Sequence, residues 1–171
     1  MQDISTRVAL ADRGAVERDE QGPALAAQLA EVELAAAGTA VTGPGVAVTV
    51  QDAEVDAVTG LVPEGGEVLD RDLQLVANGL WQAGAEAVAV NDHRLGATTA
   101  IRAAGEAILL DLRPLVPPYV VTAVGDEGLA DRFDEGPAAA QLRGLARDYG
   151  LRWMAERADL VTLPGVSGAR S

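Results

Sequence analysis

The change of hydrophobic period between residues 46 and 81 constrains the fold more than any other feature of the sequence. Val46, Val48 and Val50 occupy every second position, the spacing of one buried face of a β-strand. A later segment carries apolar side chains at the spacings of a core-facing helix: Leu73, Val76, Ala77, Leu80 and Trp81. We therefore expect this helix to pack on the valine face, with Trp81 included, and to form the main core.

The remaining segments predict further strands and helices. Asp70 and Asp72 suit the start of the first helix, and Gly84 suits its end. Residues 52–67 are acidic and contain glycine and proline, which predicts an exposed loop. The other expected elements are strands at 87–90 and 119–124, a hairpin within 100–115, helices near 129–133 and over 138–149, and extended segments at 151–155 and 160–163.

The order of these elements predicts the fold class. Strand, helix, strand, hairpin, strand, helix and strand follow one another, which is close to the ferredoxin-like split β-α-β sandwich of the α+β class, with the hairpin as an inserted arm. Two helices would then cover one face of the sheet. The other face must be covered by an N-terminal helix, by a partner chain or by water.

The N-terminal segment, residues 1–42, predicts a helical lead before an α+β domain at 43–165 and a disordered tail at 166–171. Leu25, Leu29 and Val32 form one narrow apolar stripe on this helix. The lead either lies on its own domain or forms a short coiled coil or stalk. In both cases something packs against the stripe.

The residue types that the chain lacks exclude several kinds of chemistry. There is no Cys, so disulfides, thiolate nucleophiles and zinc-thiolate sites are excluded. There is no Lys, which excludes a Schiff base and a phosphate-binding loop ending in Gly-Lys-Ser/Thr. A Ser-His-acid triad would have to bring a chain end, carrying Ser5, Ser167 or Ser171, to the single histidine, His93.

The charge of the chain argues against nucleic acid as a partner. The sequence has 26 acidic and 13 basic residues, a formal net charge of −13, and the arginines form no basic cluster. The acidic balance would instead suit a basic partner surface. No stretch approaches the roughly 20 apolar residues that a bilayer span needs, so we expect this chain to be soluble.

The sequence predicts no metal and no cofactor. Asp52, Glu54 and Asp56 alternate as metal-binding carboxylates can, but the segment lacks the glycine and the terminal glutamate of a calcium loop. A solvated acidic face is the favoured interpretation. His93 is expected to be an exposed loop residue, because only carboxylates are available to join it as ligands.

Several short motifs between Gly43 and Gly125 resemble a known bacterial family. They are Gly43-Pro-Gly-Val, Leu75-Val-Ala-Asn78-Gly-Leu-Trp81, Gly84-Ala-Glu86-Ala, Val90-Asn91 with Arg94, Thr98-Thr-Ala-Ile101-Arg102, and Pro117-Pro-Tyr119-Val with Gly125-Asp126. Together they resemble the YlxW/YlxX-like family, also known as domain of unknown function 881, over residues 25–165.

The resemblance implies a setting and no activity. It implies a membrane-tethered protein of Gram-positive bacteria, with an N-terminal transmembrane helix, a coiled-coil-prone linker and this domain outside the cytoplasmic membrane. Some members are encoded near cell-division genes. This chain departs from the pattern because it lacks the membrane helix and because Gly22-Pro23 breaks its lead.

The candidate site lies at the end of the second predicted strand. Asn91 and Arg94 match the family's Asn-x-x-Arg pattern, and with Asn78, Trp81 and Tyr119 they could line a small polar cleft for an anionic or sugar-like group. The alternative is structural: Asn91 would bond the turn backbone, and Arg94 would pair with a carboxylate such as Glu86 or Asp126.

Two classes of function remain open. The favoured one is a noncatalytic interaction module of the cell envelope that binds protein or a second copy of itself. The other is an enzyme or binder of small polar ligands that works through carboxylates. That second class requires an acid/base pair to converge from Asp92, Glu106, Asp111 and Asp126.

Overall fold

The computed structural model describes residues 23–25, 27–28 and 38–166. The chain divides into two compact units, residues 1–38 and 39–171. In the first unit, Leu25 lies in a helical segment and is 59% exposed, whereas Leu29 and Val32 of the predicted stripe lie outside the described residues. The predicted tail lies outside them as well, apart from residue 166.

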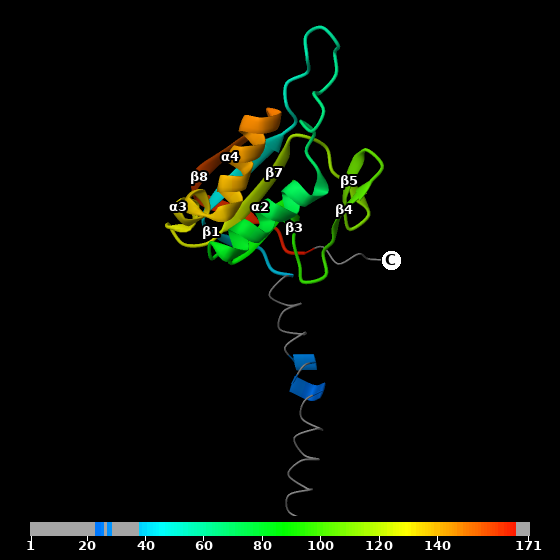
Figure 1. Ribbon diagram of the computed structural model, residues 1–171. Helices are drawn as coiled ribbons and strands as arrows, with labels where there is room; N and C mark the ends of the chain where they lie inside the picture. The colour runs from blue at the N-terminus through cyan, green and yellow to red at the C-terminus, as the bar shows by residue number, and fades with distance from the viewer. Residues whose placement is uncertain (1–22, 26, 29–37, 167–171) are drawn as a thin grey trace, which may run out of the picture. The chain divides into compact units, whose positions relative to one another are not determined.

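The second unit is a mixed α and β domain, which confirms the predicted class at that level (Figure 1). Five strands form the main sheet in the order β3-β2-β7-β1-β8, and every neighbouring pair is antiparallel. Its elements are β1 (Val41–Gln51), β2 (Ala87–Val90), β3 (His93–Arg94), β7 (Tyr119–Val124) and β8 (Arg152–Leu163), with helices α2 (Asp70–Gln82), α3 (Leu129–Glu135) and α4 (Pro137–Tyr149).

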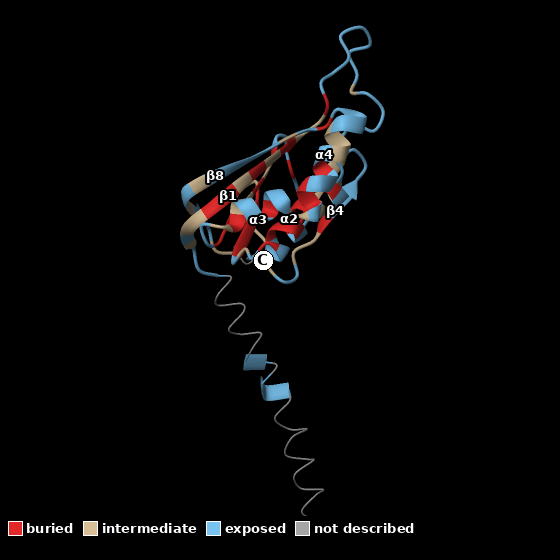
Figure 2. Ribbon diagram, turned by 60° about the vertical axis from the view of Figure 1, so that its left-hand side comes forward, coloured by how far each residue is buried: buried red, intermediate tan, exposed pale blue. Residues whose placement is uncertain are grey.

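The main core lies between the helices and one face of this sheet (Figure 2). Val46, Val48 and Val50 are fully buried, as are Leu73 and Leu80, and all five belong to one core cluster, so the predicted shared core of α2 and the β1 valines is confirmed. The inclusion of Trp81 was wrong, because its side chain is 41% exposed. A residue that follows Leu80 directly points about 100° away around the helix axis, and this rotation takes Trp81 out of the core.

The far face of the sheet has its own small apolar cluster. Ala87 and Ala89 alternate along β2 with the core residues Val88 and Val90, so their side chains point away from the helices. They are buried together with Val124 and Leu163, and Val41 and Val161 pack beside them. The rest of this face includes the partly exposed Ala47, Thr49, Val120 and Thr122.

The predicted hairpin arm is a separate sheet of three strands. β4 (Ile101–Ala104), β5 (Ala107–Leu110) and β6 (Arg113–Pro114) pair in that order. The short β6 was missed because two residues carry no periodicity. Side chains of α2 hold the arm, since Asp70 Oδ2 accepts from the backbone N–H of Ala103 at 3.1 Å and Gln74 Nε2 donates to the carbonyl of Ile101 at 2.8 Å.

The helix ends follow the expected local chemistry. Gly84, just beyond the α2 C-cap, and Gly150 at the α4 C-cap have φ of +98° and +76°, conformations that glycine adopts at little cost. At the start of α2, the buried Asp72 accepts a hydrogen bond from the backbone N–H of Leu69 at 2.9 Å through Oδ2. Burial of its carboxyl group raises the pKa of Asp72.

The last two predicted extended segments are one strand. β8 runs without interruption from Arg152 to Leu163 and pairs with almost all of β1. The charged residues Glu156, Arg157 and Asp159 hid its middle from a search for alternating apolar residues. The register between the two strands shifts once, between Gly43 and Gly45, which lie inside β1 and not at its entrance.

Gly45 is required by close packing and not by an unusual backbone angle. A Cβ atom at this position would collide with the carbonyl oxygen of Ala123 on β7, and φ is not positive there. At Gly43 the nearest atom to such a Cβ is a methyl group of Val124, at 3.1 Å, and a side chain can move aside.

We therefore expect Gly45→Ala to destabilise the domain by about 1–3 kcal/mol, because the β1–β7 pair must separate to admit the methyl group. Gly43→Ala is the matched control and should cost clearly less. Urea denaturation of both variants measures the difference in unfolding free energy. Equal midpoints for Gly45→Ala and the unmodified chain would contradict the steric explanation.

Candidate functional site

Asn91 joins two segments of backbone at the end of β2. Its Oδ1 accepts a hydrogen bond from the backbone N–H of Val120 at 2.8 Å, and its Nδ2 donates to the carbonyl of Val116 at 2.9 Å. Between these two residues lies the cis peptide bond of Pro117-Pro118. Asn91 has φ of +44°, a conformation that asparagine tolerates better than most residues. The side chain thus holds the proline turn against the sheet.

Arg94 lies on β3 and has no ion pair within the part of the chain that the structure describes. One terminal nitrogen donates to the carbonyl of Pro164 at 3.4 Å, and its Nε is buried without a partner among the described residues. This burial lowers the pKa of Arg94. The expected pairing with Asp126 is wrong, because that carboxylate binds Arg132 at 2.8 Å.

The five predicted site residues do not converge on one cleft. Asn78 and Trp81 are exposed on α2. Tyr119 pairs with Val50 and is buried on the helix side of the sheet, where burial raises its pKa. Arg94 pairs with Ala89, whose side chain belongs to the opposite face. A ligand cleft built from all five side chains is therefore not formed.

His93 is half-buried in β3 opposite Val90, so the prediction of an exposed loop histidine was wrong. The two-residue strand was not visible in the sequence. Across residues 23–25, 27–28 and 38–166, no three His, Asp or Glu side chains lie close enough together to hold a metal ion.

Two of the four candidate carboxylates, Asp111 and Asp126, bind backbone groups of the domain. Asp111 Oδ1 accepts from the backbone N–H of Ala100 at 2.9 Å, and Asp126 Oδ1 accepts from Gly128 at 2.8 Å as well as from Arg132. In the acidic loop, Asp56 Oδ1 accepts from the backbone N–H groups of Val58 and Thr59, and these bonds lower its pKa. Asp56 and Asp126 thus each shape a turn, and Asp111 closes the end of the β4–β5 pair.

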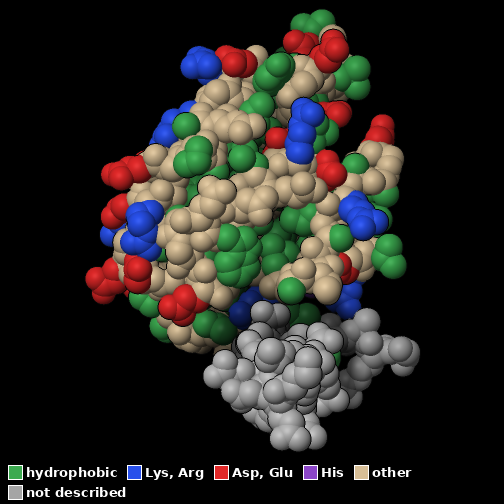
Figure 3. All heavy atoms as spheres, turned by 60° about the horizontal axis from the view of Figure 1, so that its bottom comes forward, with side chains coloured by type: hydrophobic (Ala, Val, Ile, Leu, Met, Phe, Trp, Pro, Cys, Tyr) green, Lys and Arg blue, Asp and Glu red, His purple; other side chains and the backbone are tan. Residues whose placement is uncertain are grey.

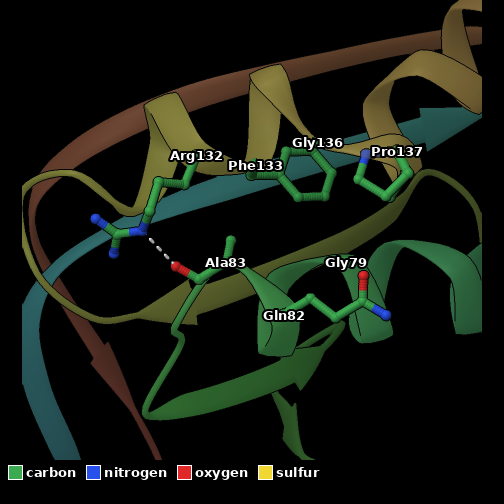
Figure 4. Close-up of a pocket in the computed structure, with 8 residues that line it drawn as sticks. Gly79, Gln82, Ala83, Arg132, Phe133, Gly136 and Pro137 are labelled. Atoms are coloured by element: carbon green, nitrogen blue, oxygen red, sulfur yellow. Dashed lines mark hydrogen bonds between the residues drawn. The ribbon is translucent and has the colours of Figure 1, made fainter.

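A shallow recess of about 110 Å³ lies between the three helices (Figure 4). Arg132 is its charged lining residue, but its Nε donates to the carbonyl of Ala83 at 2.7 Å and a terminal nitrogen pairs with Asp126. Ligand pockets usually enclose about 300–1,000 Å³, so this recess is too small for one. Sequence reasoning did not identify Arg132, because no spacing links it to Ala83.

Exposed apolar side chains are concentrated on the acidic loop, around the arm and on β8. In the view of Figure 3, hydrophobic side chains gather between interspersed acidic and arginine side chains. The most exposed large hydrophobic residues of the domain are Val55, Val58 and Leu61 in the acidic loop, Leu112 and Val116 in or after the arm, and Met154 and Leu160 on β8.

Comparison with known proteins assigns the chain to a bacterial family. Residues 28–171 match the family described as "Bacterial protein of unknown function (DUF881)". The chain belongs to this family. A UPF0749 protein of Mycobacterium tuberculosis is 39% identical to this DUF881 chain over 165 residues, which cover 92% of the chain and 52% of the relative. A UPF0749 protein of Mycobacterium bovis is 32% identical over 139 residues, covering 79% and 43%.

A solved structure shares the fold of the DUF881 domain. It is the crystal structure of an uncharacterized conserved protein from Mycobacterium tuberculosis, with a TM-score of 0.63 and 28% identity, covering 84% of this chain and 94% of that one. The chain spans about half the length of the curated relatives it matches. Their names do not include YlxW or YlxX, so that part of the resemblance remains a prediction.

The family assignment brings no activity with it, because the family is one of unknown function. Among the described residues, no helix combines the length and the apolar character needed to cross a bilayer.

Proposed function

We propose that this DUF881 domain is a noncatalytic interaction module that binds protein. One observation carries the proposal: the candidate catalytic side chains with resolved contacts bind the domain's own backbone, while exposed apolar side chains lie on a loop, an arm and an edge strand. Apolar groups displayed on protruding elements suit a partner surface better than a substrate pocket.

The fold supports this proposal because α2, α3 and α4 all lie on one face of the sheet. We infer that the domain is ferredoxin-like, since β2-β7-β1-β8 is the order expected when two strand-helix-strand units interlock in one antiparallel sheet. The described helices occupy one face of that sheet, and the arm is an insertion between β2 and β7.

The cellular setting is also part of the proposal. A membrane anchor before the lead, a coiled-coil lead and an extracytoplasmic domain would raise the effective concentration of the module, so that even weak contacts form. Support for this setting comes from the family resemblance alone. A role in cell division has no support in the structure and is not proposed.

The lead provides the test of the module. We expect Leu25→Glu with Leu29→Glu to abolish association of the chain, measured by analytical ultracentrifugation, and to leave the circular dichroism of the 39–166 domain unchanged. Ala27→Glu with Ala30→Glu adds the same charge away from the stripe and is the control. If the stripe variant unfolds the domain, the stripe belongs to the core; if the unmodified chain neither self-associates nor captures a protein in cells, the proposal fails.

A binder of small anions at Arg94 is the second candidate. It is favoured by the unpaired Nε and by the lack of a carboxylate partner among the described residues. Among the described residues, the one hydrogen bond of this guanidinium goes to the carbonyl of Pro164. A bound anion would therefore be attracted by a single arginine. We therefore rank it behind the interaction module.

A further inference from the structure

We propose that β8 pairs edge to edge with β8 of a second copy of the chain, in an antiparallel register centred on Met154. The main sheets of the two chains would then become one continuous sheet across a two-fold axis. This inference rests on the proposed function and adds to it a partner, a surface and a register.

The two edges of the main sheet differ in how they are protected. β3 forms one edge, is two residues long, and has Arg94 bonded to the carbonyl of Pro164. β8 forms the other edge, is 12 residues long, and within residues 38–166 pairs with β1 alone, on one side. A long unpaired edge presents a row of free N–H and C=O groups, which is a template for another strand.

Residues 152–158 of β8 include three charged side chains, but they lack two other devices that block edge pairing, proline and a β-bulge. This stretch contains no proline and no glycine, and its register with β1 is regular, since the one irregularity lies beyond Ala158. Met154 is 52% exposed here. The edge thus has a regular register with β1, is exposed at Met154 and is partly apolar.

The alternation of side chains limits the possible registers. Met154 and Glu156 pair with Thr49 and Ala47 of β1, so they share the far face of the sheet, and Arg152 shares it too. Trp153 and Ala155 point to the helix side. In a two-fold antiparallel pair, opposite residues must lie on the same face, so even positions pair only with even positions and odd with odd.

Charge then selects one register. When Met154 lies opposite Met154 of the second copy, Arg152 of each chain lies opposite Glu156 of the other. Centring the pair on Ala155 places Glu156 opposite Met154, and centring it on Glu156 places two carboxylates together. Opposite charges across a strand pair stabilise it and like charges destabilise it, so the Met154-centred register is favoured.

Glu156 is available for this pairing, and Arg152 is held near it by contacts within its own chain. Glu156 is exposed and has no hydrogen bond or ion pair with another described residue. Arg152 is fixed at the edge by its Nε, which donates to the carbonyl of Asp52 at 3.0 Å, and its contact with Glu54 is long, at 3.8 Å. The net charge of −13 opposes association at low ionic strength, whereas near 0.15 M salt charges beyond about 8 Å are screened.

The lack of cysteine in the chain allows a direct test by disulfide formation. Met154→Cys should introduce two thiols that face each other, with Cα atoms about 4.5–5.5 Å apart, which a disulfide can span. We expect mild oxidation at 0.15 M salt to give mostly covalent dimer, measured by intact mass. Leu160→Cys is the control, because it is more exposed, at 73%, yet lies outside residues 152–156, the part of β8 that this register pairs. Equal dimer yields from the two variants would overturn the register.

Charge exchange without cysteine tests the same contact. Arg152→Glu alone and Glu156→Arg alone should each weaken association at least tenfold in sedimentation, because each brings like charges together. The variant that carries both changes should recover association.

If both single variants associate as the unmodified chain does, β8 is not the contact. If association is then still lost on Leu25→Glu with Leu29→Glu, the interaction module stands and only the β8 inference fails. A monomeric unmodified chain with no Met154→Cys dimer contradicts the β8 inference, and capture of another protein would still preserve the module.

Discussion

Leu80→Ala should lower the free energy of unfolding by about 2–5 kcal/mol, a large share of the 5–15 kcal/mol that stabilises a typical domain. Leu80 is fully buried, and it belongs to the cluster that joins α2 to the sheet. Its truncation removes apolar contacts and leaves a cavity that rigid neighbouring strands cannot fill. Thermal and urea unfolding, followed by circular dichroism, measure the loss.

Trp81→Ala is the matched control, because it removes a larger side chain from the next position of the same helix. Trp81 is 41% exposed and lies outside the core cluster, so its truncation should cost clearly less than that of Leu80. If the tryptophan variant were the less stable of the two, the assigned inner face of α2 would be wrong.

Asn91→Ala should cost about 2–4 kcal/mol, the second largest effect that we expect. The substitution leaves the partly buried N–H of Val120 without its side-chain partner, which costs about 1–3 kcal/mol, and it also removes the exposed bond to the carbonyl of Val116. It also places alanine at φ of +44°, which adds about 1 kcal/mol of backbone strain. The unfolding free energy in urea is the measurement.

Two further substitutions separate these causes. Asn91→Gly removes the hydrogen bonds but accepts the positive φ, so it should be more stable than the alanine variant. Asn91→Asp keeps the acceptor for Val120 and loses only the donor to Val116, so it should be the mildest of the three. A ligand role for Asn91 without a structural one would instead leave all three variants as stable as the unmodified chain.

Local sequence pattern correctly predicted the elements whose signal lies within a few neighbouring residues. The valines of β1, the stripe of α2 and the glycine at the end of α4 each carry a signal within a few residues. Such signals depend on period, capping and turn chemistry, which do not require knowledge of distant residues. The same signals gave the mixed α and β class.

Features that depend on distant residues were missed or misassigned. β8 becomes one strand because β1 pairs along it, although its own middle is charged. Arg132 donates a hydrogen bond to the carbonyl of Ala83 and forms an ion pair with Asp126, so Asp126 does not pair with Arg94. The structural role of Asn91 was one of two open alternatives, and only the position of Val116 and Val120 distinguishes them.

The position of β1 in the sheet has a consequence for the synthesis of the chain. Both strands that pair with β1 come much later in the sequence, and β8 is the last element of the domain. The ribosome therefore releases β1 long before its neighbours exist, and local helix formation cannot bury its valines. Contacts between such distant segments form slowly, since a long loop must close first. Folding of the sheet must wait until β8 has been synthesised, and until then the apolar β1 depends on chaperones or on dilution to avoid pairing with other chains.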